Sequence, residues 1–88
     1  MRLGKVVGHL WSTKKQDSLT GMKLMIVEPL DPTNKCKEQL PIVAVDSVGA
    51  GIGEMVIYAT GSSARKAVSN ENAPVDAAVL GIVDNVEL

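Results

Sequence analysis

The sequence has 88 residues and a formal net charge of -1, from nine Lys and Arg against ten Asp and Glu. It is 45% hydrophobic and 22% charged, which is too apolar for a disordered chain, yet its only aromatic residues are Trp11 and Tyr58. A monomeric nucleic-acid-binding protein needs a basic surface and commonly uses aromatic platforms for the bases, so the composition speaks against that class.

A chain of this length forms one domain at most, residues 1–88. Cys36 is the only cysteine, so no disulfide within the chain supports the small core, and a reducing cytosolic compartment is expected. The N-terminal apolar run is interrupted by Lys5 and His9, unlike a signal peptide, and no stretch approaches a membrane span. We expect a cytoplasmic chain that buries further surface against copies of itself.

Most of the chain is predicted to form extended segments. Period-two patterns and turn residues predict strands over 2–12, 22–28, 40–46, 54–60 and 77–83. One short helix is expected after Gly61, with Ser62 or Ser63 as its N-cap. Five short strands and one helix predict a mainly β fold, a small five-stranded OB-like barrel of antiparallel strands. Trp11, near a strand end, is expected in the core or at an interface.

The segment 46–54 carries three alternating glycines, Gly49, Gly51 and Gly53. Their G-x-G-x-G spacing fails both the dinucleotide fingerprint and the phosphate-binding P-loop, which needs a following Lys and Ser or Thr. Glycine alone adopts positive φ angles cheaply and lets backbones approach closely. The segment therefore predicts a loop between strands, and a second interpretation is that another subunit packs against it.

Catalytic and metal sites find little support in the remaining residues. A nucleophilic Ser62 or Ser63 would need a base, and His9 is the only histidine, so no catalytic residue is assigned. One His and one Cys per chain fall short of a zinc site, so no metal or cofactor is expected. The aspartates near strand ends are explained by turn formation. Arg65, placed in the first turn of the helix, is expected to pair with Glu54 or Asp76, within or between subunits.

The order and spacing of several segments together resemble the EutN/CcmL family of bacterial microcompartment vertex proteins. The matching segments cover nearly the whole chain and are residues 4–13, 19–24, 28–31, 43–54, 61–65 and 74–84. The chain lacks the longer C-terminal tail of many carboxysome members, which favours a catabolic microcompartment.

The resemblance implies a cyclic homopentamer that closes the vertices of an icosahedral shell, with hexameric shell proteins as its other partners. It implies a structural protein in the cytoplasmic microcompartment shell, without enzyme activity, cofactor, nucleic-acid or membrane partner. Heterologous contacts of such a ring place different patches against each other. The residues expected at the subunit interface or an axial pore are Gly49, Ala50, Gly51, Gly53, Glu54, Ser62, Ser63 and Arg65.

Two other functions stay open from the residues alone. An OB-like module that binds nucleic acid or another ligand is the main alternative, and tight salt-dependent binding of an oligonucleotide would support it. A small enzyme with a serine nucleophile is the third interpretation, and it lacks a base.

Overall fold

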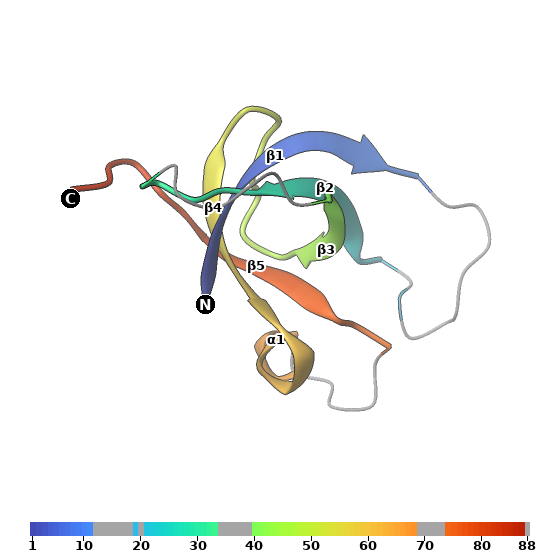
Figure 1. Cartoon of the computed structure of the whole chain (residues 1–88). Helices are drawn as coiled ribbons and strands as arrows, with labels where there is room; N and C mark the ends of the chain where they lie inside the picture. The colour runs from blue at the N-terminus through green and yellow to red at the C-terminus, as the bar shows by residue number, and fades with distance from the viewer. Residues whose placement is uncertain (12–18, 20, 34–39, 69–73, 88) are drawn as a thin grey trace.

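The computed structural model of the chain describes residues 1–11, 19, 21–33, 40–68 and 74–87. Five strands and one helix follow in chain order: β1 (Arg2–Leu10), β2 (Lys23–Pro29), β3 (Ile42–Asp46), β4 (Met55–Thr60), α1 (Gly61–Ala67) and β5 (Ala77–Ile82). The strands close into a barrel in the order β1-β2-β3-β5-β4 (Figure 1). The predicted fold class, a five-stranded barrel with one short helix, is confirmed.

One pair of neighbouring strands differs from the expected antiparallel arrangement. β3 and β5 are parallel, with Val45 opposite Ala78 and Asp46 opposite Val79, whereas the other four pairings are antiparallel. Parallel neighbours need a long crossover connection, and the chain between them makes β4 and α1 first. The expectation of antiparallel strands throughout was therefore wrong for this pair.

The barrel interior is filled by aliphatic side chains around one aromatic ring, that of Tyr58. A Cβ atom at Gly4 would lie 2.5 Å from Val27 Cγ1 and 3.0 Å from Tyr58 Cε1, so β1 requires glycine where it passes this ring. Trp11 has no place in this core because it is 89% exposed. The expectation that Trp11 is a core residue was wrong, and an interface role stays a prediction.

Helix α1 lies outside the barrel at the end of β4 (Figure 1). Its Ala64 is fully buried against Val45, Val75 and Ala78, which forms a second apolar cluster. The N-cap residue is Thr60, without a side-chain cap hydrogen bond, so the prediction of Ser62 or Ser63 as N-cap was wrong. The helix begins at Gly61, two residues before the start that a cap at Ser62 would give, and the Gly61 N–H donates to the Asp76 carbonyl at 2.9 Å.

Within the described residues, no helix has the length and apolar character that crossing a membrane requires.

Candidate functional site

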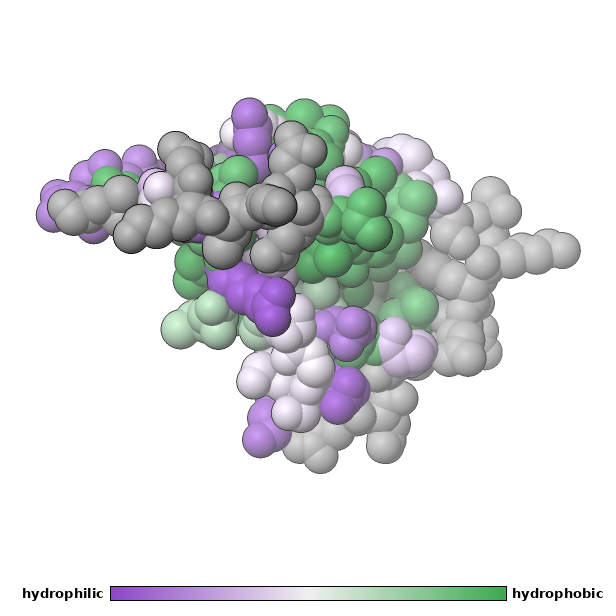
Figure 2. Space-filling model, viewed as in Figure 1, coloured by the Kyte–Doolittle hydropathy of each residue, from purple (hydrophilic) through white to green (hydrophobic). Residues whose placement is uncertain are grey.

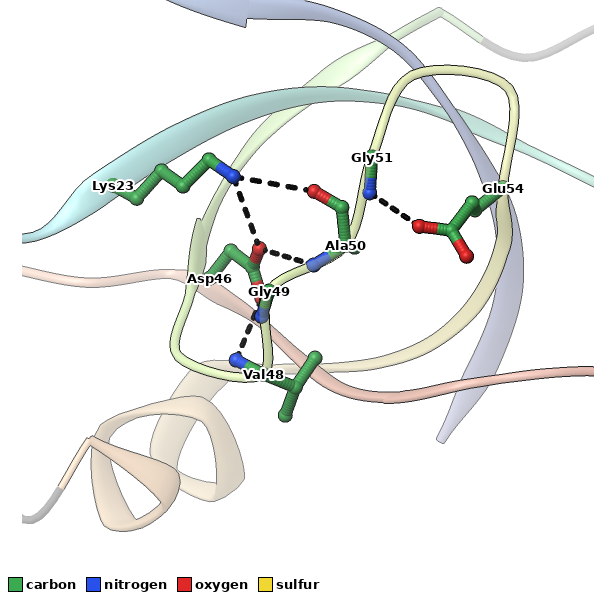
Figure 3. Close-up of polar contacts among 7 residues, drawn as sticks. All are labelled: Lys23, Asp46, Val48, Gly49, Ala50, Gly51 and Glu54. Atoms are coloured by element: carbon green, nitrogen blue, oxygen red, sulfur yellow. Dashed lines mark hydrogen bonds and ion pairs between the residues drawn. The ribbon is translucent and has the colours of Figure 1, made fainter.

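The glycine-rich loop, residues 47–54, joins β3 to β4 (Figure 3). It follows Asp46, the last residue of β3, whose side chain is buried. Asp46 Oδ1 accepts hydrogen bonds from the N–H groups of Val48 at 2.9 Å and Gly49 at 3.2 Å. Asp46 Oδ2 accepts one from the Ala50 N–H at 2.8 Å. An aspartate that binds the backbone just after itself is the usual chemistry of a turn, so the expectation of turn formation at Asp46 is confirmed.

Lys23 holds the same loop from the neighbouring strand. It lies opposite Asp46 in the β2–β3 register, and its Nζ lies 4.0 Å from Asp46 Oδ2 and donates to the Ala50 carbonyl at 3.3 Å. The Lys23 side chain is 47% exposed, so solvent screening limits this pair to less than about 1 kcal/mol. The backbone hydrogen bonds of Asp46 therefore dominate the local stabilisation.

Ala50 is the point where the loop enters the barrel. Its side chain is completely buried in the barrel's own core, and its N–H and carbonyl are both hydrogen-bonded, to Asp46 and Lys23. The side chain therefore cannot contact a neighbouring subunit or line a pore, and the prediction that placed Ala50 there was wrong for this side chain. In the sequence, a small apolar residue between glycines looks the same whether its side chain faces the core or a neighbouring subunit.

The second half of the loop is a tight turn fastened to β1. The Glu54 N–H donates to the Gly51 carbonyl at 3.1 Å, and the Gly51 N–H donates to the Glu54 carboxylate. The Gly53 N–H donates to the Val6 carbonyl at 2.7 Å. Gly49 and Gly53 have φ angles of 87° and 90° with open space where a Cβ would lie, so backbone conformation rather than crowding requires glycine. The turn presents Ile52, which is 61% exposed.

Ser62, Ser63 and Arg65 lie on α1. Both serines are exposed in its first turn. Arg65 lies in the last turn of this seven-residue helix, where a cation is favoured by the helix dipole, and its Nη1 donates to the Val75 carbonyl at 3.4 Å. Within one protomer, the described residues include no ion pair of Arg65 with Glu54 or Asp76. The expected first-turn position of Arg65 was wrong, and a carboxylate partner on another subunit stays a prediction.

The structure divides the predicted contact residues into two groups. Gly51, Gly53 and Glu54 precede β4, whereas Ser62, Ser63 and Arg65 follow it. The six residues of β4 separate the groups, and a strand rises about 3.3 Å per residue, so they lie about 20 Å apart. One protomer therefore does not bring them into a single patch.

The part of the chain that the structure describes holds no group of three or more His, Cys, Asp or Glu placed to bind a metal ion. His9 lies beside Trp11, with ring centroids 6.4 Å apart. Cys36 lies outside the described residues. The arrangement as a whole is that of a small closed barrel whose polar contacts shape a rigid glycine-rich loop.

Comparison with known proteins assigns this barrel to a family. The family model described as "Ethanolamine utilisation protein EutN/carboxysome" matches residues 1–84, and the chain belongs to the EutN/CcmL family. It is 48% identical over 91 residues to the bacterial microcompartment shell vertex protein GrpN of Rhodospirillum rubrum, covering 99% of this chain and 97% of the relative.

Two further comparisons extend the likeness. The carboxysome shell vertex protein CcmL of Synechocystis is 47% identical over 88 residues, covering 100% of this chain and 87% of the relative. The solved structure of GrpN, described as a pentameric microcompartment shell protein from Rhodospirillum rubrum, superposes with a TM-score of 0.86 over 100% of this chain and 99% of that chain. The resemblance found in the sequence is therefore confirmed.

Proposed function

We propose that this chain is a structural shell protein that forms the pentameric vertex of a bacterial microcompartment. The observation that carries the proposal is the match along the full chain to shell vertex proteins, one of which has a solved structure described as pentameric. The whole chain, residues 1–88, acts as one barrel domain. A closed shell tiled by hexagonal units needs fivefold units at its vertices, and a cyclic homopentamer supplies them.

The partners follow from this role. Each subunit contacts two copies of itself within the ring, and the rim of the ring contacts the hexameric shell proteins around it in the cytoplasmic microcompartment shell. No enzyme activity or cofactor enters the proposal. The OB-like nucleic-acid-binding alternative finds no support in the names of the relatives or in the net charge.

Seven residues remain candidates for the subunit contact, in the two groups at opposite ends of β4. A cyclic ring uses heterologous contacts, in which two different patches meet. Two separate groups on one protomer suit this requirement, because one group of one subunit can face the other group of its neighbour. The candidates are Gly49, Gly51, Gly53, Glu54, Ser62, Ser63 and Arg65.

Two experiments test the proposed function. Native mass spectrometry of the purified chain is expected to show a complex of five subunits, whereas a monomer that binds oligonucleotides tightly in low salt would overturn the proposal. In cells, deletion of the protein is expected to leave elongated or leaky shells whose enclosed enzymes stay active. Normal closed shells after deletion would contradict the vertex role.

A further inference from the structure

Three neighbouring strands present uncovered apolar side chains on the outside of the barrel. Gly8 of β1 lies opposite Ile26 of β2, which lies opposite Val43 of β3. Met25 and Val27 are buried inside the barrel, so Ile26 between them points outward, because successive side chains alternate between the faces of a strand. A Cβ atom at Gly8 would lie 3.4 Å from Ile26 Cδ1, which places Gly8 on the same face.

This surface, named here the β1–β2–β3 outer face, consists of Val7, Gly8, Leu10, Ile26 and Val43. Val7 lies where the β1–β2 register shifts between Val6 and Gly8. Val7, Leu10 and Val43 are 41%, 39% and 49% exposed. In Figure 2, apolar side chains gather over the part of the molecule where Figure 1 places β2 and β3.

Among the residues that the structure describes, helix α1 covers one part of the sheet exterior. Its Ala64 packs against Val45 at the end of β3 and against Ala78 of the neighbouring β5, at the edge of the face. On the N-terminal side of Val7, the cross-strand pair of Lys5 on β1 and Glu28 on β2 is charged. Between that pair and the helix, the described residues of the face are uncharged and apolar, which is the character of the central part of a protein interface.

The face is continuous with the glycine-rich loop. The Gly53 N–H donates to the carbonyl of Val6, and the Val6 N–H donates to the carbonyl of Glu54 at 2.9 Å, so the turn that presents Ile52 is fastened to β1 next to Val7. These bonds fix the backbone of the turn that carries Ile52, so the position of this residue is set before any partner binds. A preorganised apolar group loses less conformational freedom on binding than a flexible one.

We infer that the β1–β2–β3 outer face, extended by Ile52, is the surface on which a second copy of this chain docks in the ring. The inference rests on the proposed function, since it names one side of the pentamer contact. The occupant is another copy because the face adjoins the loop proposed for that contact and because the related solved structure is described as pentameric. The patch that meets this face on the neighbouring subunit then contains the residues at the other end of β4, which are Ser62, Ser63 and Arg65.

The test introduces a charge on one of the two strands that flank Ile26 in the face. Val43→Glu and Val7→Glu, each made in the full chain, are expected to raise the subunit concentration at which the pentamer dissociates by at least about tenfold, because burying an unpaired carboxylate is costly. Native mass spectrometry and sedimentation over a dilution series measure this shift. Circular dichroism is expected to show the parent β signal, since both side chains are exposed in the protomer.

A matched control and a milder variant keep the result interpretable. Val86→Glu introduces the same charge at a valine of similar exposure, 38%, in the segment that leaves the barrel after β5 (Figure 1), and it is expected to dissociate like the parent. Val43→Thr keeps the shape and adds one hydroxyl, so a weakened pentamer is expected even if the glutamate variant fails to fold.

The outcomes separate this inference from the proposed function. A parent pentamer that Val7→Glu and Val43→Glu leave unchanged would overturn the inference alone, and so would a Val86→Glu variant that dissociates as readily as they do. A parent chain that forms no pentamer would contradict the proposed function first.

Discussion

Replacing Asp46 with alanine is expected to destabilise the protomer by about 3 kcal/mol. The carboxylate accepts hydrogen bonds from the N–H groups of Val48, Gly49 and Ala50. Water can reach Val48 and Gly49 once the carboxylate is gone, because both residues are exposed, but Ala50 is completely buried. Its orphaned N–H costs about 1–3 kcal/mol, and the lost charge-assisted bonds account for the remainder.

Asparagine at this position is expected to give an intermediate loss of about 2 kcal/mol. The amide oxygen can still accept from two N–H groups, but its NH₂ group then faces the third donor, so one backbone N–H loses its acceptor. The expected order of stability is therefore parent, Asp46→Asn, Asp46→Ala. For a chain of 88 residues, a loss of 3 kcal/mol corresponds to a fall in Tm of about 15 °C.

The assay is thermal and urea unfolding followed by circular dichroism. All proteins are compared at one subunit concentration, because assembly stabilises the folded state by mass action. Asp84→Ala is the control: Asp84 is exposed, and the change is expected to stay within about 0.5 kcal/mol of the parent. An Asp46→Ala variant equally close to the parent would refute the reasoning that this carboxylate holds the loop.

Three further predictions concern the glycines and Lys23. Gly4→Ala is expected to lower the free energy of unfolding by about 1–3 kcal/mol because its Cβ would lie 2.5 Å from Val27 Cγ1; Gly81→Ala, whose Cβ would lie no closer than 3.5 Å to a neighbouring atom, is the control, and equal melting temperatures would contradict this. Gly53→Ala is expected to cost about 1–2 kcal/mol in urea unfolding through its positive φ, and Gly53→Asn less; a larger loss with asparagine would argue against a backbone cause. Lys23→Gln is expected to change the unfolding free energy by less than about 1 kcal/mol, because its side chain is 47% exposed; a loss as large as that of Asp46→Ala would assign the loop's stability to the ion pair instead.

The strand positions followed directly from local chemistry. Alternating apolar residues and the turn residues between them predicted five strands, and each bound differs from the observed one by two residues or fewer. β3 begins at Ile42, directly after Pro41, which has no N–H to donate to a sheet. The helix after Gly61 was predicted as well, although its N-cap is Thr60 and not Ser62 or Ser63. The hydrogen bond from Gly61 to the distant carbonyl of Asp76 is a contact that no local pattern reveals.

The candidate site shows the limit of local patterns. The glycine spacing correctly predicted a loop, and two of its glycines have the positive φ angles that favour this residue. Ala50 was grouped with them by position alone, yet the loop turns its side chain into the barrel. Glu54 and Ser62 were grouped as one region, yet β4 keeps them at opposite ends. Adjacency in sequence does not say on which side of a closed barrel a side chain lies.

The fold class, the turn chemistry of the loop and, through the order of its motifs, the family could all be predicted from the amino-acid sequence. These three features depend on the residues close to one another in the sequence, and few other folds or families have the same residue types in the same order. The parallel pairing of β3 with β5, the burial of Ala50 and the outward position of Ile26 and Val43 are visible only in the folded barrel. Each of these depends on which strands become neighbours when the barrel closes, and that choice is made by contacts between residues far apart in the chain.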